Sequence, residues 1–169
     1  MDVTRIYLVG YMGCGKSYWG KRLADSLSFD FVDLDNLIEE REGLTIPEIF
    51  TQFGEASFRN MEQKALLYTK ELKKSTIIST GGGAPCFHNN MSVMNTMGQT
   101  LFLEASPFVL KHNILKSDDE RPIVKAVPEV ELETYIANHL NSRLSFYQQA
   151  QFKCNVDGLK LEDLKQLFQ

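Results

Sequence analysis

The sequence predicts an α/β domain built around a mostly parallel sheet. Short apolar runs of strand type alternate with longer segments that have helical spacing, and this alternation is typical of the class. The run from Ile6 to Val9 is apolar at nearly every position, as expected for a strand that helices cover on both faces. The chain has 169 residues, so we expect a single domain over 1–169.

The predicted elements follow one another in a regular order. The expected strands are Arg5–Val9, Phe31–Leu34, Thr76–Ser79, Thr100–Leu103 and Gln151–Val156. The expected helices are Lys16–Leu27, Leu44–Phe53, Ser57–Lys73, Pro107–Leu115, Glu129–Gln149 and Leu161–Phe168. Because parallel strands need long crossover connections, this order predicts a five-stranded parallel sheet flanked by helices.

Two segments interrupt the alternation. About forty mostly helical residues separate the second and third predicted strands, where a crossover needs only about 12. We therefore expect an inserted helical subdomain over about 35–73. The stretch KSDDERPIVKAVP, Lys116–Pro128, is polar and bounded by proline. Long polar loops in small domains are often functional, so we expect a lid over about 116–128.

Composition excludes several classes of protein. The net charge of −4 argues against a broad nucleic-acid surface, which would need a basic face. No apolar run approaches the roughly 18 residues that span a bilayer, and the first residues lack the features of a signal peptide. The three cysteines have no metal-ligand spacing, so we expect reduced thiols. We expect a cytoplasmic monomer that binds neither nucleic acid nor membrane.

A glycine-rich loop joins the first predicted strand to the first predicted helix. Residues 10–17, GYMGCGKS, match the phosphate-binding pattern G-x-x-x-x-G-K-[ST]. Glycines let backbone N–H groups turn toward one point, and the helix start adds further N–H groups and its positive dipole end. Lys16 can reach the β- and γ-phosphates, and the Ser17 hydroxyl can ligate Mg²⁺. We expect the chain to bind a nucleoside triphosphate with Mg²⁺ through Gly13, Cys14, Gly15, Lys16, Ser17 and Tyr18.

Two aspartates close the second predicted strand. Ligands of parallel sheets bind beyond the carboxyl ends of the strands, so Asp33 and Asp35 should reach the edge where the glycine loop lies. Alternate residues of a strand share a face, so we expect both carboxylates to point the same way. One can serve Mg²⁺, and the other can orient or deprotonate an acceptor hydroxyl. The alternative is that Asp35 caps a helix.

Three consecutive glycines follow the third predicted strand. In TGGGA, Thr80–Ala84, they would let a ligand approach the backbone closely. Ser79, at the end of the strand, could hold a water on Mg²⁺. The alternative is a flexible turn before Pro85.

Three arginines come from separate segments that should border one cleft. Arg59 lies in the insertion, Arg121 in the predicted lid, and Arg143 in the long late helix. Arginine pairs bidentately with carboxylate and phosphate, and a lid arginine could stabilise charge on a transferring phosphoryl group. The alternative for each is a solvated surface charge.

Taken together, these motifs resemble the shikimate kinase family, small phosphate-loop kinases that use ATP to phosphorylate the 3-hydroxyl of shikimate. The resemblance covers nearly the whole chain. It rests on GYMGCGKS, the D-x-D of Asp33 and Asp35, GEASFRNMEQKAL (54–66), STGGGA, Arg121-Pro122 and SRLSFY (142–147). It implies a three-layer P-loop kinase fold with ATP and Mg²⁺ as cofactors.

The resemblance also implies a role for each candidate residue. Asp35 would bind the shikimate hydroxyls and act as or orient the base, while Asp33 would assist Mg²⁺. Lys16, Asp35 and Arg121 form the implied catalytic set, with Arg121 closing over the phosphates. The implied substrate contacts are Asp35, Arg59, Gly81, Gly82, Gly83 and Arg143, the two arginines clamping the carboxylate. Phe50 and Phe58 would form an apolar wall, although their spacing alone equally predicts helix core, and Glu62 would hold Arg59.

Two other functions remain open at this point. A related small kinase acting on gluconate or a nucleoside monophosphate would share the glycine loop. A nucleotide-binding module without transfer activity would share it as well. Lys116 stands where family members often carry an arginine that stacks on adenine, so how this chain holds the base is left open.

Overall fold

The computed structural model describes residues 3–117 and 127–168. Its centre is a five-stranded sheet in the order β2-β3-β1-β4-β5, with every pairing parallel. The strands are β1 (Arg5–Val9), β2 (Asp30–Asp33), β3 (Thr76–Ser79), β4 (Gln99–Glu104) and β5 (Phe152–Asn155). The predicted α/β fold and the five-stranded parallel sheet are confirmed.

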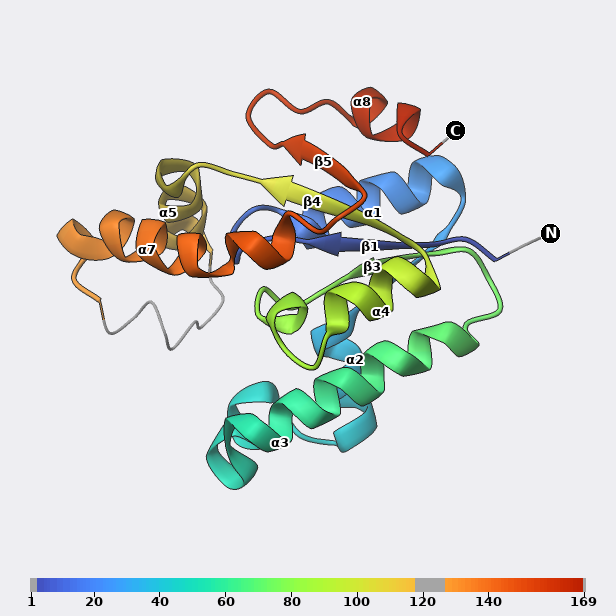
Figure 1. Cartoon of the computed structure of the whole chain (residues 1–169), viewed down its shortest axis with the longest axis horizontal. Helices are drawn as coiled ribbons and strands as arrows, with labels where there is room; N and C mark the ends of the chain where they lie inside the picture. The colour runs from blue at the N-terminus through green and yellow to red at the C-terminus, as the bar shows by residue number, and fades with distance from the viewer. Residues whose placement is uncertain (1–2, 118–126, 169) are drawn as a thin grey trace.

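The helices cover the sheet and fill the predicted insertion (Figure 1). They are α1 (Lys16–Leu27), α2 (Leu34–Glu42), α3 (Ile46–Tyr68), α4 (Asn90–Met97), α5 (Pro107–Lys116), α7 (Glu129–Tyr147) and α8 (Leu161–Gln166), with 3₁₀ turns η1 (Thr69–Glu71) and η2 (Ala84–Cys86). All of β3 and nearly all of β1 are buried, because helices cover both faces of these strands. Helices α2 and α3 project away from the sheet at the bottom of the view.

The insertion differs from the predicted pair of helices. The segment before Leu44 forms α2, which apolar spacing alone did not indicate. Helix α3 runs as one element with a kink at Gly54, whose φ of 76° is a left-handed conformation that glycine adopts without strain. The kink therefore lies where the sequence predicted a break between two helices. A capping box starts α3, with the Thr45 side chain accepting from Glu48 N–H and Glu48 accepting in return from Thr45 N–H.

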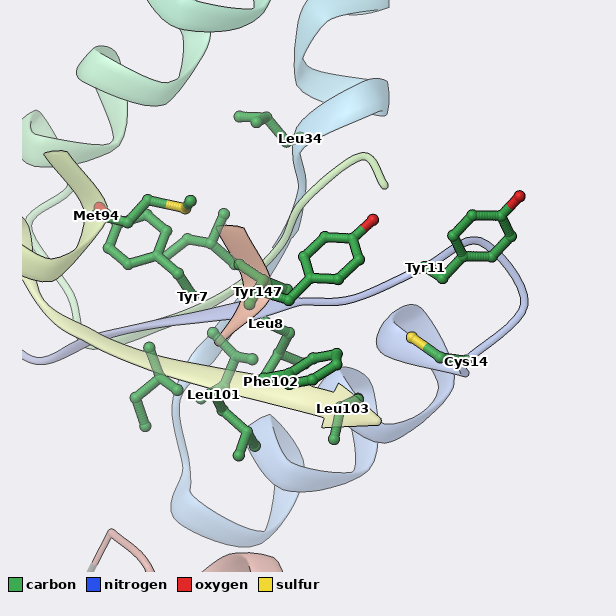
Figure 2. Close-up of a cluster of buried hydrophobic side chains, with 14 of the residues drawn as sticks. Tyr7, Leu8, Tyr11, Cys14, Leu34, Met94, Leu101, Phe102, Leu103 and Tyr147 are labelled. Atoms are coloured by element: carbon green, nitrogen blue, oxygen red, sulfur yellow. The ribbon is translucent and has the colours of Figure 1, made fainter. Parts of the chain in front are cut away.

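The hydrophobic core reaches from the sheet into the glycine loop. Figure 2 shows side chains of β1 and β4 packed together, with Tyr11 and Cys14 at the end where the loop enters α1. Tyr147 stacks on Phe102, with ring centroids 5.3 Å apart. The Tyr11 hydroxyl shares a hydrogen bond of 2.9 Å with His139 Nδ1 on α7. The Tyr11 ring and this bond join the glycine loop to α7.

The carboxyl-terminal end of the insertion is tied to the central strand. Arg5, the first residue of β1, donates from Nε to Thr69 O at 2.8 Å and from Nη2 to Leu72 O at 2.9 Å. The Tyr7 hydroxyl pairs with Thr69 Oγ1 at 2.8 Å. These contacts satisfy carbonyls at the end of α3 and fix where the chain returns to the sheet.

The predicted lid falls mostly on residues 118–126, and Arg121 among them lies outside the described residues. Across the ranges that the structure does describe, no helix is both long enough and apolar enough to cross a membrane.

Candidate active site

The glycine loop forms the start of one large cleft. A cavity of about 1200 Å³ runs from this loop to the insertion and the triple glycine. Gly15, with a φ of 90°, caps α1, so the free N–H groups of the first helical turn face the loop. The Lys16 ammonium lies under the loop and donates to Gly10 O at 2.7 Å and Tyr11 O at 2.9 Å. These features form a cradle for phosphate, and Tyr18 lines the same cleft.

Three side-chain oxygens meet beside this cradle. Ser17 Oγ donates to Asp33 Oδ2 at 2.7 Å and lies 3.1 Å from Ser79 Oγ. Within residues 3–117 and 127–168, no group of three or more His, Cys, Asp or Glu is arranged to hold a metal. Mg²⁺ prefers a few protein oxygens completed by phosphate and water, so this small oxygen cluster fits that ion.

The two aspartates occupy different elements, which corrects the sequence-based argument. Strand β2 ends at Asp33, one residue earlier than expected, and α2 begins at Leu34. Asp33 is the residue that caps the helix, since its Oδ1 accepts from Asp35 N–H at 3.1 Å. Asp35 lies in the first turn of α2, so neither strand alternation nor the idea that Asp35 is the cap was right. Both aspartates nevertheless line the cleft.

Asp35 carries a carboxyl oxygen without a partner. Its Oδ1 is buried and accepts no hydrogen bond from the described residues. Burial, followed by repulsion from Asp33, raises the pKa of Asp35 to about 6, while Lys16 and Arg59 oppose the shift. A buried carboxylate with a raised pKa in a cleft is a candidate for a group that meets a substrate hydroxyl.

Arg59 is held by two glutamates of its own helix. Its Nη1 lies 2.9 Å from Glu62 Oε2, and its Nη2 lies 3.1 Å from Glu55 Oε1. The guanidinium carbon lies 4.1 Å from the centroid of the Phe87 ring. The expectation that Glu62 holds Arg59 is confirmed. Burial raises the pKa of Glu62 to about 7, although the Arg59 charge acts to lower it.

The triple glycine lets these groups close around the backbone. A Cβ at Gly81 would lie 3.1 Å from both Asp35 Oδ1 and Glu62 Oε1, and a Cβ at Gly83 would lie 2.8 Å from Arg59 Nη2. The Tyr147 hydroxyl donates to Gly82 O at 2.6 Å and fixes the turn. The segment forms a turn that these side chains approach closely, as the absence of side chains at the glycines allows.

Other candidates take different places. Phe50 and Phe58 line the cleft with ring centroids 4.6 Å apart. Arg143 lies on α7 with its guanidinium carbon 5.9 Å from the centroid of the Tyr11 ring, beside the cleft and not on its lining. Asn113 on α5 was missed, although it donates to Gly13 O at 2.8 Å. Its position in a helix that leads toward the predicted lid could have indicated that it lies near the glycine loop.

Comparisons with known proteins identify the family of this chain. The family model described as shikimate kinase matches residues 12–169. A shikimate kinase of Bacteroides thetaiotaomicron is 44% identical over 158 residues, covering 94% of this chain and 90% of the relative. One of Bacteroides fragilis is 45% identical over 165 residues, covering 98% and 90%.

Solved structures extend the comparison to the fold. The crystal structure of the Bacteroides thetaiotaomicron shikimate kinase matches with a TM-score of 0.92 at 41% identity, covering 98% of each chain. That of the Acinetobacter baumannii shikimate kinase in complex with shikimate matches with a TM-score of 0.85 at 30% identity, covering 98% and 90%. A gluconokinase of Sinorhizobium meliloti, at 15% identity and a TM-score of 0.57, shares only the fold. Because the family model matches residues 12–169 and the two Bacteroides relatives are 44–45% identical over most of the chain, this chain belongs to the shikimate kinase family.

Proposed function

We propose that this chain transfers the γ-phosphoryl group of ATP to the 3-hydroxyl of shikimate. One observation carries the proposal. The phosphate cradle, a buried carboxylate and a paired arginine all line a single cleft. A polyanionic donor and an alcohol bearing a carboxylate would thus meet in one cavity, which is the arrangement that an in-line transfer needs.

At the donor end, Lys16 and the amides of the glycine loop would bind the phosphates of ATP. The Lys16 ammonium donates to the carbonyls of Gly10 and Tyr11, so it already points toward the loop. Ser17 and Asp33, with Ser79 next to them, would hold Mg²⁺ directly or through water. Bound Mg²⁺ would supply charge neutralisation for the phosphates.

At the acceptor end, Asp35 would accept a hydrogen bond from the reacting hydroxyl and take its proton as the new O–P bond forms. Its unpaired Oδ1 and its raised pKa support this role. A carboxylate with a pKa of about 6 is mostly ionised at neutral pH and is a stronger base than an ordinary aspartate. The proton leaves the hydroxyl for Asp35, and ADP departs with the electron pair of the broken bond.

Arg59 would bind the substrate carboxylate, with Arg143 as a second cation near the site. The buried pairing of Arg59 with Glu62 supports this assignment, because it fixes the guanidinium beside the backbone of Gly81 to Gly83. Arg121 would stabilise charge on the transferring group. Its assignment rests on the Arg121-Pro122 motif alone, since that residue lies outside the described residues.

A coupled assay of ADP release tests the proposal and separates the alternatives. Shikimate, gluconate and AMP are supplied in parallel with Mg²⁺-ATP. Release that depends on shikimate alone is the expected result. Release with gluconate or AMP alone would assign one of the related kinase activities, and the absence of release with all three would leave a nucleotide-binding module.

A further inference from the structure

Every nitrogen of the Arg59 guanidinium donates to a carboxylate of the chain itself. Glu62 accepts a hydrogen bond from Nη1. Oε1 of Glu55 accepts from both Nε, at 3.3 Å, and Nη2, at 3.1 Å. Each of the three nitrogens therefore already donates to a glutamate. The Nε–Nη2 edge, which offers two parallel N–H groups to an incoming carboxylate, is the edge that Glu55 occupies.

The two glutamates differ in what their release would cost. The Glu62 side chain is 1% exposed and the Glu55 side chain is 58% exposed. Separating Arg59 from Glu62 would leave a buried charge without its partner, which is strongly destabilising. Releasing Glu55 would return its carboxylate to water, and an exposed ion pair four residues apart on a helix is weak.

We propose that Glu55 is a built-in competitor of the substrate carboxylate, which displaces it from the Nε–Nη2 edge of Arg59 on binding. The proposal rests on the assignment of Arg59 as a substrate contact. Glu62 is then the permanent anchor of Arg59, and Glu55 is an exchangeable partner. An acidic acceptor can replace the lost ion pair with one of its own, whereas a neutral acceptor cannot, so Glu55 favours acceptors that carry a carboxylate.

A purely structural role for Glu55 predicts something different. Glu55 directly follows the kink at Gly54 and begins the second half of α3. A carboxylate there would stabilise the helix start through the dipole. That role would change the melting temperature on substitution and would leave the affinity for shikimate unchanged.

The test compares Glu55→Gln with wild type and with Glu71→Gln, which removes the same charge at the far end of the insertion. Shikimate binding is measured by the fluorescence of Trp19, the one tryptophan of the chain, which lines the cleft. Turnover is measured by ADP release. We expect Glu55→Gln to lower the Kd and KM for shikimate about two- to fivefold, with the KM for ATP unchanged. Glu71→Gln should match wild type.

A double-mutant cycle with Arg59→Ala distinguishes competition from a general effect of charge. In the Arg59→Ala background, the gain from Glu55→Gln should disappear. A gain of equal size in that background, or an unchanged or raised Kd in Glu55→Gln alone, would overturn the proposal. Wild-type enzyme without shikimate-dependent ADP release would instead overturn the proposed function, so the two failures are distinguishable.

Discussion

Asp33 caps the helix that carries Asp35, because its Oδ1 accepts from the Asp35 backbone N–H at 3.1 Å. Its other oxygen, Oδ2, accepts from the Ser17 hydroxyl at 2.7 Å. One carboxylate thus joins the proposed Mg²⁺ site to the position of the proposed base. The two roles can be separated by substitution.

Asp33→Ala should lose both roles, whereas Asp33→Asn should keep the cap. An asparagine oxygen can still accept from Asp35 N–H, but its amide carries no charge for Mg²⁺. We expect Asp33→Ala to lose about 1 kcal/mol of stability and Asp33→Asn much less. Both should need more Mg²⁺ for half-maximal ADP release. Equal loss of melting temperature in the two variants would contradict the capping role.

The activity should follow the ionisation of Asp35. With its pKa raised to about 6, the carboxylate is protonated below that pH and cannot take a proton from the acceptor. We therefore expect kcat/KM for shikimate to rise with pH through about 6. Glu62, whose pKa is raised to about 7, acts through Arg59. The Glu62→Gln variant should therefore keep the rise of kcat/KM near pH 6. If the rise of kcat/KM near pH 6 were lost in Glu62→Gln, the titrating group would be Glu62.

The same raised pKa predicts a gain in stability from Asp35→Asn. The folded state holds this proton more tightly than the unfolded state does, so ionisation of Asp35 lowers stability as the pH rises through about 6. Asp35→Asn should therefore melt higher than wild type at pH 8, and the difference should shrink toward pH 5. Its turnover should fall by about 10²- to 10⁴-fold. A lower melting temperature at pH 8 would show that the charged form is stabilised.

Arg59→Ala should chiefly raise the KM for shikimate. Removing a charged hydrogen bond to the substrate carboxylate costs about 1.5–3 kcal/mol, or about 10- to 100-fold in KM. The KM for ATP should not change, because Arg59 lies on α3 beside Gly83 and is not part of the phosphate cradle. A wild-type KM for shikimate in this variant would refute the assignment of Arg59.

Lys16→Ala should reduce turnover at least about 10²-fold, since the ammonium would bind phosphate charge in the transition state. Lys21→Ala, on the same helix, is the matched control and should keep wild-type turnover. Equal loss in both variants would mean that the effect comes from α1 as a whole.

The parts of this fold that follow local rules could be predicted from the sequence. Short runs rich in apolar residues predicted the strands, and G-x-x-x-x-G-K-[ST] predicted the phosphate cradle because its geometry depends on adjacent residues. The sequence analysis considered a cap only at Asp35, two residues beyond the true cap Asp33, because a shift of one residue in a strand end changes which side chain begins the helix. Helix α4 was missed because it is only eight residues long and starts at asparagine, a residue that favours turns as much as helices.

Contacts between distant segments were the least accessible. Glu62 could be paired with Arg59 because three residues on a helix share a face. The bond between Tyr11 and His139 joins residues 128 positions apart, and no local pattern encodes it. The role of Glu55 depends on exposure, which the spacing of charges does not reveal.

The triple glycine of the proposed acceptor site exposes peptide without side chains. At Gly81 and Gly83 any side chain would press on Asp35, Glu62 or Arg59, the groups that the reaction is proposed to use. An inhibitor that binds against this backbone would leave few substitutions that give resistance. A side chain at these glycines that blocked the inhibitor would also displace groups that the proposed reaction needs.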